Sequence, residues 1–342
     1  MDFLCVDIGG GTQDICYYTE EDSFENSVKM VLPTPTKRIC RNIAAIEDDL
    51  FIGGGVIGGG DLSKVIKEKS AKGYNIFISS NAYPSVRDDI SYVKSIGAQV
   101  VEDVINPNVV LDEFDYETIS FCVKSAIGRC NPHVVLAAAQ DHGYIPNQKD
   151  RITRFNFLKE FLKNGLRNAC YKDENQIPKN FTRWRSLAQS VKTKCPKSQM
   201  IISDTAVIAA IGAASVTDIR PVITVDAGNC HTFAALIGEN DKVYAFFEHH
   251  THSLNQESAM TLINKLASCQ IDGEEILENK GHGAYIFESV NASSCPILVT
   301  GPNREKLFSQ NDRVIFSHPK GDTMMAGPVG LLIQAGVNLK HP

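Results

Sequence analysis

The chain has 342 residues, of which 43% are hydrophobic and 22% charged, and its formal net charge is −6. This composition is ordinary for a protein with a sizeable core, and it excludes a disordered or fibrous chain. Because no long basic run is present, we expect neither nucleic acid nor a membrane surface as a partner. At roughly 100–200 residues per domain, the length predicts two domains, or one with an insertion.

The sequence carries no sign of export or membrane insertion. It begins MDFLC, acidic where a signal peptide is basic, and its most apolar stretch, residues 205–216, is shorter than the ~20 residues that a membrane span needs. The ten cysteines are scattered and form no Cys-x-x-Cys pair, which favours reduced thiols. We therefore expect a cytoplasmic protein.

The first predicted elements are three short strands, at residues 3–8, 15–18 and 27–32. A glycine-rich turn joins the first two, which is typical of a hairpin. Residues 36–116 follow as an insertion with an α/β pattern of its own. The first half then continues with a strand at 134–138, a helix at 151–166, a strand at 200–202 and an alanine-rich helix at 205–214.

The same pattern starts again near residue 221. Three strands are expected at 222–225, 232–237 and 243–247, followed by a helix at 258–266, a strand at 297–300, a helix at 304–308, a strand at 313–316 and a helix at 324–335. Such alternation predicts α/β layers around sheet cores. We expect a first half over residues 1–204, which carries the insertion, and then, over 205–342, the connecting alanine-rich helix and the second half.

Two turns rich in small residues occupy equivalent places in the two halves. The first is DIGGGTQD at residues 7–14, and the second is DAGNCHT at 226–232. Glycines let backbone N–H groups approach an anion closely, and a carboxylate at a strand end can hold Mg²⁺ against phosphates. One such turn alone is as readily a bare structural turn, but two could face each other and grip one polyphosphate. The candidate nucleotide-binding residues are Gly9, Gly10, Gly11, Thr12, Asp226, Gly228 and Asn229, and the candidate Mg²⁺ ligands are Asp7 and Asp226.

These two turns, with three further segments, resemble the signature of the actin, sugar-kinase and heat-shock-chaperone ATPase superfamily. DTAVIAAIG at 204–212 resembles its first connecting helix, LVTGPN at 298–303 its adenosine loop, and MAGPVG at 325–330 its second connecting helix. The resemblance implies two duplicated actin-like (ribonuclease H-like) α/β domains around a central nucleotide cleft. It also implies ATP and Mg²⁺ as cofactors, with Gly301 at the nucleoside. Pro302 departs from the family pattern, because it replaces a second glycine and removes a backbone donor.

More narrowly, the sequence resembles a largely archaeal branch whose members are often labelled "putative pyruvate formate-lyase activating enzyme". The matching pieces are GGG at 58–60, RDD at 87–89, QDHG at 140–143 and EHHTHSL at 248–254. Radical activating enzymes of that type hold an iron–sulfur cluster through a Cys-x-x-x-Cys-x-x-Cys run. The sequence has no such run.

The resemblance implies that the loop after the strand at 134–138 points toward the γ-phosphate. Gln140, Asp141 or His142 could then orient a water molecule or accept a proton from a substrate hydroxyl. With Asp7, they are the candidate catalytic residues. The alternative for Asp141 is a structural cap on a turn.

A histidine-rich segment, EHHTH, follows the third strand of the second half. On an extended chain His250 and His252 lie on one face, and with His142 they could hold a second divalent metal. They could equally contact a substrate or phosphate, or be ordinary surface and core histidines.

We therefore expect a Mg²⁺-dependent ATP-binding protein that hydrolyses ATP or transfers its γ-phosphoryl group to a small-molecule or protein acceptor. One alternative is an ATP-gated binding module or an activator of a metallo- or radical enzyme. An activator of that kind would need cysteines such as Cys122 and Cys130 at the face of a homodimer. Another alternative is a metal-dependent hydrolase that uses the histidine cluster.

Overall fold

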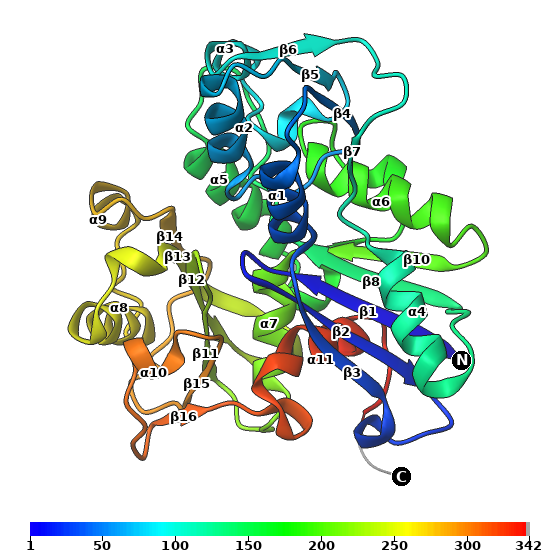
Figure 1. Cartoon of the computed structure of the whole chain (residues 1–342). Helices are drawn as coiled ribbons and strands as arrows, with labels where there is room; N and C mark the ends of the chain where they lie inside the picture. The colour runs from blue at the N-terminus through cyan, green and yellow to red at the C-terminus, as the bar shows by residue number, and fades with distance from the viewer. Residues whose placement is uncertain (340–342) are drawn as a thin grey trace.

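The computed structural model describes residues 1–339 and contains two six-stranded sheets with a third, four-stranded sheet (Figure 1). The first sheet has the order β3 (Val28–Pro33), β2 (Thr12–Thr19), β1 (Asp2–Ile8), β8 (Val134–Ala139), β10 (Gln199–Ser203) and β9 (Cys170–Tyr171). The second has the order β14 (Gly283–Ile286), β13 (Val243–His250), β12 (His231–Ile237), β11 (Val222–Ala227), β15 (Ile297–Thr300) and β16 (Val314–Phe316).

The two large sheets share one topology. In each, an antiparallel meander of three strands is extended by two strands that run parallel to its first strand. In the first sheet β1 pairs with β2 on one side and β8 on the other, and in the second β11 pairs in the same way with β12 and β15. This is the duplicated actin-like architecture, and it confirms the predicted fold class.

Two helices cross between the large sheets. They are α7 (Thr205–Ala214) and α11 (Ala326–Gln334), which lie at the centre of Figure 1. The residues of α7 after Thr205 are all buried, because one side of this helix packs on the second sheet and the other on α11 and the first sheet. A Cβ on Gly212 would lie 1.9 Å from the carbonyl oxygen of Ala326, so the crossing requires glycine there.

The insertion forms the upper part of the molecule in Figure 1. Its parallel sheet has the order β6 (Ala98–Val101), β5 (Ile76–Ser79), β4 (Leu50–Gly54) and β7 (Val109–Leu111). The helices α1 (Pro35–Ala45), α2 (Leu62–Ala71) and α3 (Ile90–Ser95) share a separate hydrophobic core with this sheet. The insertion is thus a small α/β unit between β3 and the rest of the first half.

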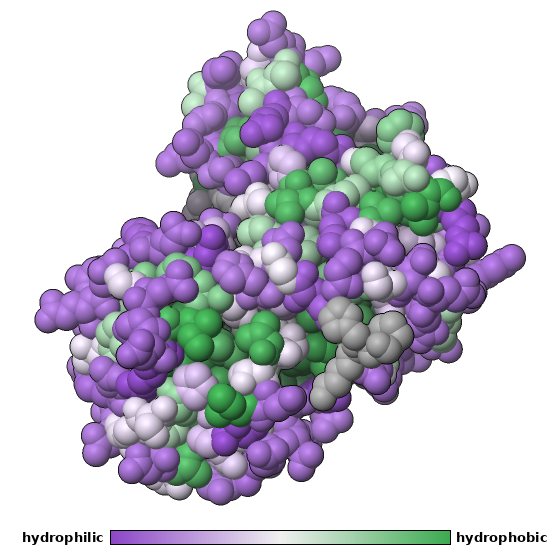
Figure 2. Space-filling view, turned by 90° about the horizontal axis from the view of Figure 1, so that it is seen from below, coloured by the Kyte–Doolittle hydropathy of each residue, from purple (hydrophilic) through white to green (hydrophobic). Residues whose placement is uncertain are grey.

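The remaining helices cover the large sheets. They are α4 (Tyr116–Ile127), α5 (Asp150–Leu162), α6 (Thr182–Lys194), α8 (Gln256–Ala267), α9 (Gly273–Glu278) and α10 (Arg304–Leu307), with short 3₁₀ turns between elements. Across residues 1–339 no helix is both long and apolar enough to cross a membrane. The face in Figure 2 is mainly hydrophilic, with hydrophobic side chains gathered in several separate areas.

Candidate functional site

The turns of the two hairpins, one in each half of the chain, face each other. We call the two halves, each built on one six-stranded sheet, the two lobes. A Cβ on Gly10 would lie 2.8 Å from Sγ of Cys230, and one on Gly11 would lie 2.5 Å from Nδ2 of Asn229. The β1–β2 turn and the β11–β12 turn therefore touch, and the glycines are what allows this approach.

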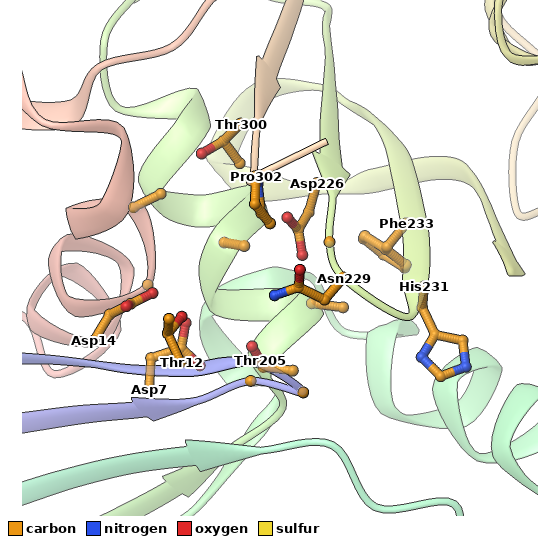
Figure 3. Close-up of a pocket in the computed structure, with 18 of the residues that line it drawn as sticks. Asp7, Thr12, Asp14, Thr205, Asp226, Asn229, His231, Phe233, Thr300 and Pro302 are labelled. Carbon is orange, nitrogen blue, oxygen red and sulfur yellow. The ribbon is translucent and has the colours of Figure 1, made fainter. Parts of the chain in front are cut away.

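Both turns line one cavity, together with α7, the start of α11 and the loop after β15. Figure 3 shows Asp7, Thr12 and Asp14 on one side and Asp226 on the other, with the Asn229 amide between them. The cavity also contains Gly9, Gly228 and Gly301, so it unites residues from both halves of the predicted nucleotide site. Its volume is about 100 Å³. Because ligand pockets usually measure roughly 300–1,000 Å³, a nucleotide would need the two lobes to part.

Three carboxylates crowd this cavity. Burial, with the nearby charges of Asp14, Asp226 and Asp204, raises the pKa of Asp7 well above its usual value, although a hydrogen bond from Thr205 opposes the shift. Burial also raises the pKa of Asp14 to about 7 and that of Asp226 to about 7. Oδ1 of Asp7 and Oδ1 of Asp14 are buried without a hydrogen-bond partner. Oxygen donors that repel one another and lack partners fit a hard divalent cation such as Mg²⁺.

Glycines also allow the approach of the surrounding elements to these carboxylates. A Cβ on Gly327 would lie 2.0 Å from Oδ2 of Asp7, and one on Gly301 would lie 2.6 Å from Oδ1 of Asp226. Gly301 has φ +90°, which disfavours any other residue. In the same loop Asn303 donates from Nδ2 to the carbonyl oxygen of Gly228 at 2.9 Å, so the loop after β15 is bound to the second turn.

The loop after β8 places Gln140 and Asp141 in different environments. Gln140 lines the cavity and donates from Nε2 to Oε1 of Glu248 at 3.1 Å. The carboxylate of Asp141 accepts hydrogen bonds from the backbone N–H groups of Gly143 and Trp184, at 2.9 and 3.0 Å. Asp141 thus caps the turn, whereas Gln140 faces the space between the hairpins.

A buried arginine, not anticipated from the sequence, joins the two lobes. Arg154 of α5 is fully buried and pairs with Asp204 and with Glu248, whose Oε1 is 3.0 Å from Nη2. Burial alone would raise the pKa of Glu248, but Arg154 and His282 hold it well below its usual value. Asp204 also caps α7, since its Oδ1 accepts from the N–H of Ala206 at 3.0 Å. The ion pairs therefore connect the first connecting helix to the second sheet.

Three histidines, His142, His231 and His282, converge beside Glu248, and one ring nitrogen from each lies within 4.8 Å of those of the other two. His142 comes from the first half, and the other two come from the second. Burial lowers the pKa of His142 well below its usual value and that of His231 to about 3, and Arg154 adds to both shifts. The imidazoles of His142 and His231 are therefore neutral near pH 7.

The two predicted histidine ligands lie beside this group. The ring of His250 is 4.8 Å from that of His282 between centroids, and the ring of His252 is 5.4 Å from that of His250. His252 is exposed, because β13 ends at His250 and the chain turns into a 3₁₀ helix. The nitrogens that converge are thus not those of the His250–His252 pair, and no local spacing pattern indicated His282.

A second cavity of about 300 Å³ adjoins the first and shares Gly10, Gln140 and His231 with it. One wall is the glycine loop 58–60 of the insertion. Glu113 connects this loop to the loop after β8, since it accepts from the N–H of Gly58 at 3.1 Å and pairs with Arg183 at 2.6 Å. Arg183 in turn donates to the carbonyl oxygen of Gln140 at 2.5 Å.

Comparison with protein families identifies the group to which the chain is related. Residues 57–306, well over half of the chain, match a family described as "Putative pyruvate format-lyase activating enzyme (DUF1786)". The chain belongs to this family. This confirms the narrower resemblance drawn from the sequence. No curated protein sequence matches the chain.

Several solved structures resemble the chain weakly. They include ethanolamine utilization protein EutJ from Carboxydothermus hydrogenoformans (TM-score 0.33, 10% identity, 97% of this chain and 89% of that chain covered). An exopolyphosphatase-like protein (TM-score 0.28, 10% identity, 88% and 66% covered) and ROK hexokinase from Thermus thermophilus (TM-score 0.23, 12% identity, 71% and 52% covered) are further examples. The fold assignment rests on the strand order, not on these likenesses.

The cysteines do not fit the iron–sulfur cluster that the family description implies. All ten are unpaired and dispersed, and within residues 1–339 the one group of three or more potential metal ligands is the histidine triad. Cys130, considered above as a cluster ligand at a dimer face, is buried in the core of the first half, and Cys122 is half-buried on α4.

Proposed function

We propose that the chain binds ATP with Mg²⁺ between its two hairpin turns and hydrolyses it or transfers its γ-phosphoryl group. The observation that carries this proposal is the shared cavity, in which Asp7 and Asp226 of equivalent hairpins face each other beside glycine-rich turns. Backbone N–H groups of the two turns would bind the phosphates, and the carboxylates of Asp7, Asp14 and Asp226 would hold the cation.

Gln140 is the proposed positioning group for the attacking water or hydroxyl. It lines both cavities, and its own orientation is defined by the bond to Glu248 and by the contact of Arg183 with its carbonyl oxygen. Phosphoryl transfer depends mainly on positioning and charge stabilisation, so a fixed amide is well suited to this role. The cavity lined by the glycine loop 58–60 would hold the phosphoryl acceptor.

Binding would involve movement of the lobes about α7 and α11. The turns are in contact, and the cavity is smaller than a nucleotide, so the lobes would open for entry and close on the phosphates. The crossing at Gly212 would act as the hinge region.

The test combines binding and turnover. Thermal melting with ATP or ADP, with and without Mg²⁺, should show stabilisation by about 2.7 kcal/mol at a hundred times the dissociation constant. Phosphate release measures hydrolysis, and Asp7→Asn should abolish the Mg²⁺-dependent part of both signals. The matched control is Asp312→Asn, on the exposed surface, which should behave as the unchanged protein. Nucleotide binding without phosphate release or transfer would support the ATP-gated module, and absence of any nucleotide response would refute the proposal.

A further inference from the structure

Two rings of the histidine triad, those of His231 and His282, have a buried nitrogen with no hydrogen-bond partner among the described residues. Nε2 of His231 and Nε2 of His282 are buried without a hydrogen-bond partner, and the His282 side chain is 1% exposed. The ring centroids of His231 and His282 lie 4.7 Å apart. The ring centroid of His142 lies 5.6 Å from that of His231 and 5.7 Å from that of His282. An unsatisfied buried polar group costs about 1–3 kcal/mol, so two such nitrogens beside the ring of His142 favour a ligand at this point.

The surroundings provide the outer support that a metal-binding histidine usually has. Nδ1 of His282 lies 2.7 Å from Oε2 of Glu248, which leaves Nε2 as the free nitrogen. A carboxylate behind an imidazole is the common outer-shell arrangement of metal sites. The charges also favour a cation, because Arg154 is opposed by both Asp204 and Glu248, which leaves one net negative charge beside the triad.

We propose that His142, His231 and His282 bind one divalent transition metal ion of the zinc type. Three imidazoles are a ligand set typical of such ions, and a tetrahedral site leaves a fourth position open. His142 and His231 line the second cavity whereas His282 is enclosed behind them, so the open position faces that cavity. A metal–nitrogen distance of about 2.1 Å places tetrahedral ligands about 3.4 Å apart, so the triad contracts by roughly 1 Å on binding.

The ion would join the two lobes. His142 follows β8 of the first sheet, while His231 and His282 belong to the β12 and β14 regions of the second. Metal binding therefore stabilises the closed arrangement of the lobes, in the same way as the Arg154 ion pairs. This proposal does not depend on nucleotide, because none of the three histidines needs a phosphate in order to bind the ion.

The experiment uses the full chain, stripped of metal with a chelator and studied without nucleotide. Titration with Co²⁺ should give visible absorption bands of a tetrahedral site that saturate at one ion per chain, and Zn²⁺ should displace them. His142→Gln and His231→Gln should each weaken Zn²⁺ binding by about 100-fold or more. Loss of an outer-shell partner alone can cost about that much, and these variants lose a ligand itself. Melting of each metal-free variant verifies that it is folded.

The matched control is His252→Gln, which removes an exposed histidine near the triad but none of its members. It should leave the stoichiometry and the affinity unchanged. Absence of saturable binding to the unchanged chain would overturn the proposal, as would an equal loss of affinity in His252→Gln and His142→Gln. If His231→Gln does not fold, His142→Gln still decides the outcome, because His142 lies on a half-exposed loop. If the chain responds to nucleotide but binds no metal, the metal site is refuted and the proposed function is not. If it binds metal but does not respond to nucleotide, the proposed function is refuted and the metal site is not.

Discussion

Replacing Asp226 by asparagine should stabilise the ligand-free protein while abolishing its response to Mg²⁺ and nucleotide. The pKa of Asp226 is raised from 3.8 to about 7 by burial and by the charges of Asp204 and Glu248. A group whose pKa is raised on folding opposes folding once it ionises. The resulting loss of unfolding free energy is absent below pH 3.8, grows as the pH rises from 3.8 toward 7, and is complete above pH 7. Asparagine has the same shape and no charge, so it removes the cost.

The magnitude follows from the shift. At about 1.36 kcal/mol per pH unit, the full cost is about 4 kcal/mol at pH 8 and about 2 kcal/mol at pH 5.5. Asp226 is only half-buried and faces a cavity, so solvent screening reduces these values by about half. For a chain of 342 residues, the substitution should then raise the melting temperature by about 3 °C at pH 8 and about 1.5 °C at pH 5.5.

The assay is thermal melting of Asp226→Asn, the unchanged chain and the surface control Asp312→Asn at the two pH values, without divalent cations. Asp312→Asn should match the unchanged chain at both. A destabilised Asp226→Asn variant, or a gain that is larger at pH 5.5 than at pH 8, would refute the electrostatic reasoning. Loss of the Mg²⁺-dependent shift with ATP in the same variant separates the ligand role from the stability effect.

Three further outcomes are expected. Arg154→Leu removes the buried cation that pairs with Asp204 and Glu248, so urea denaturation should show a loss of about 3–5 kcal/mol, and an unchanged midpoint would contradict the role of the ion pairs. Gly212→Ala places a methyl group 1.9 Å from a backbone oxygen of α11, and its free energy of unfolding should fall by about 1–3 kcal/mol in the same experiment. Gln140→Ala should slow phosphate release by about 100-fold while thermal shifts show unchanged nucleotide binding, and equal losses of both would assign Gln140 to binding instead.

Most elements could be predicted from the sequence because their patterns are local. The strands of both hairpins appear close to their expected places, since short apolar runs bounded by small residues form strands. The helix expected at 205–214 coincides with α7, where Asp204 supplies the N-cap. The equivalence of the two Asp-x-Gly turns was likewise readable, because each follows a strand of the same topology.

The sequence by itself determined two similar halves, the insertion and the two glycine turns, because these depend on residues close together in the chain. Only the tertiary structure decided which side chains meet between the lobes. Arg154 looked like an ordinary helix residue, yet it is buried against Asp204 and Glu248. The sequence predicts that His250 and His252 lie on one face of an extended chain. That prediction needs the strand to continue through His252, but β13 ends at His250. His142, His231 and His282 come together instead because closure of two separately folded sheets brings distant loops into contact, and no local spacing encodes that closure.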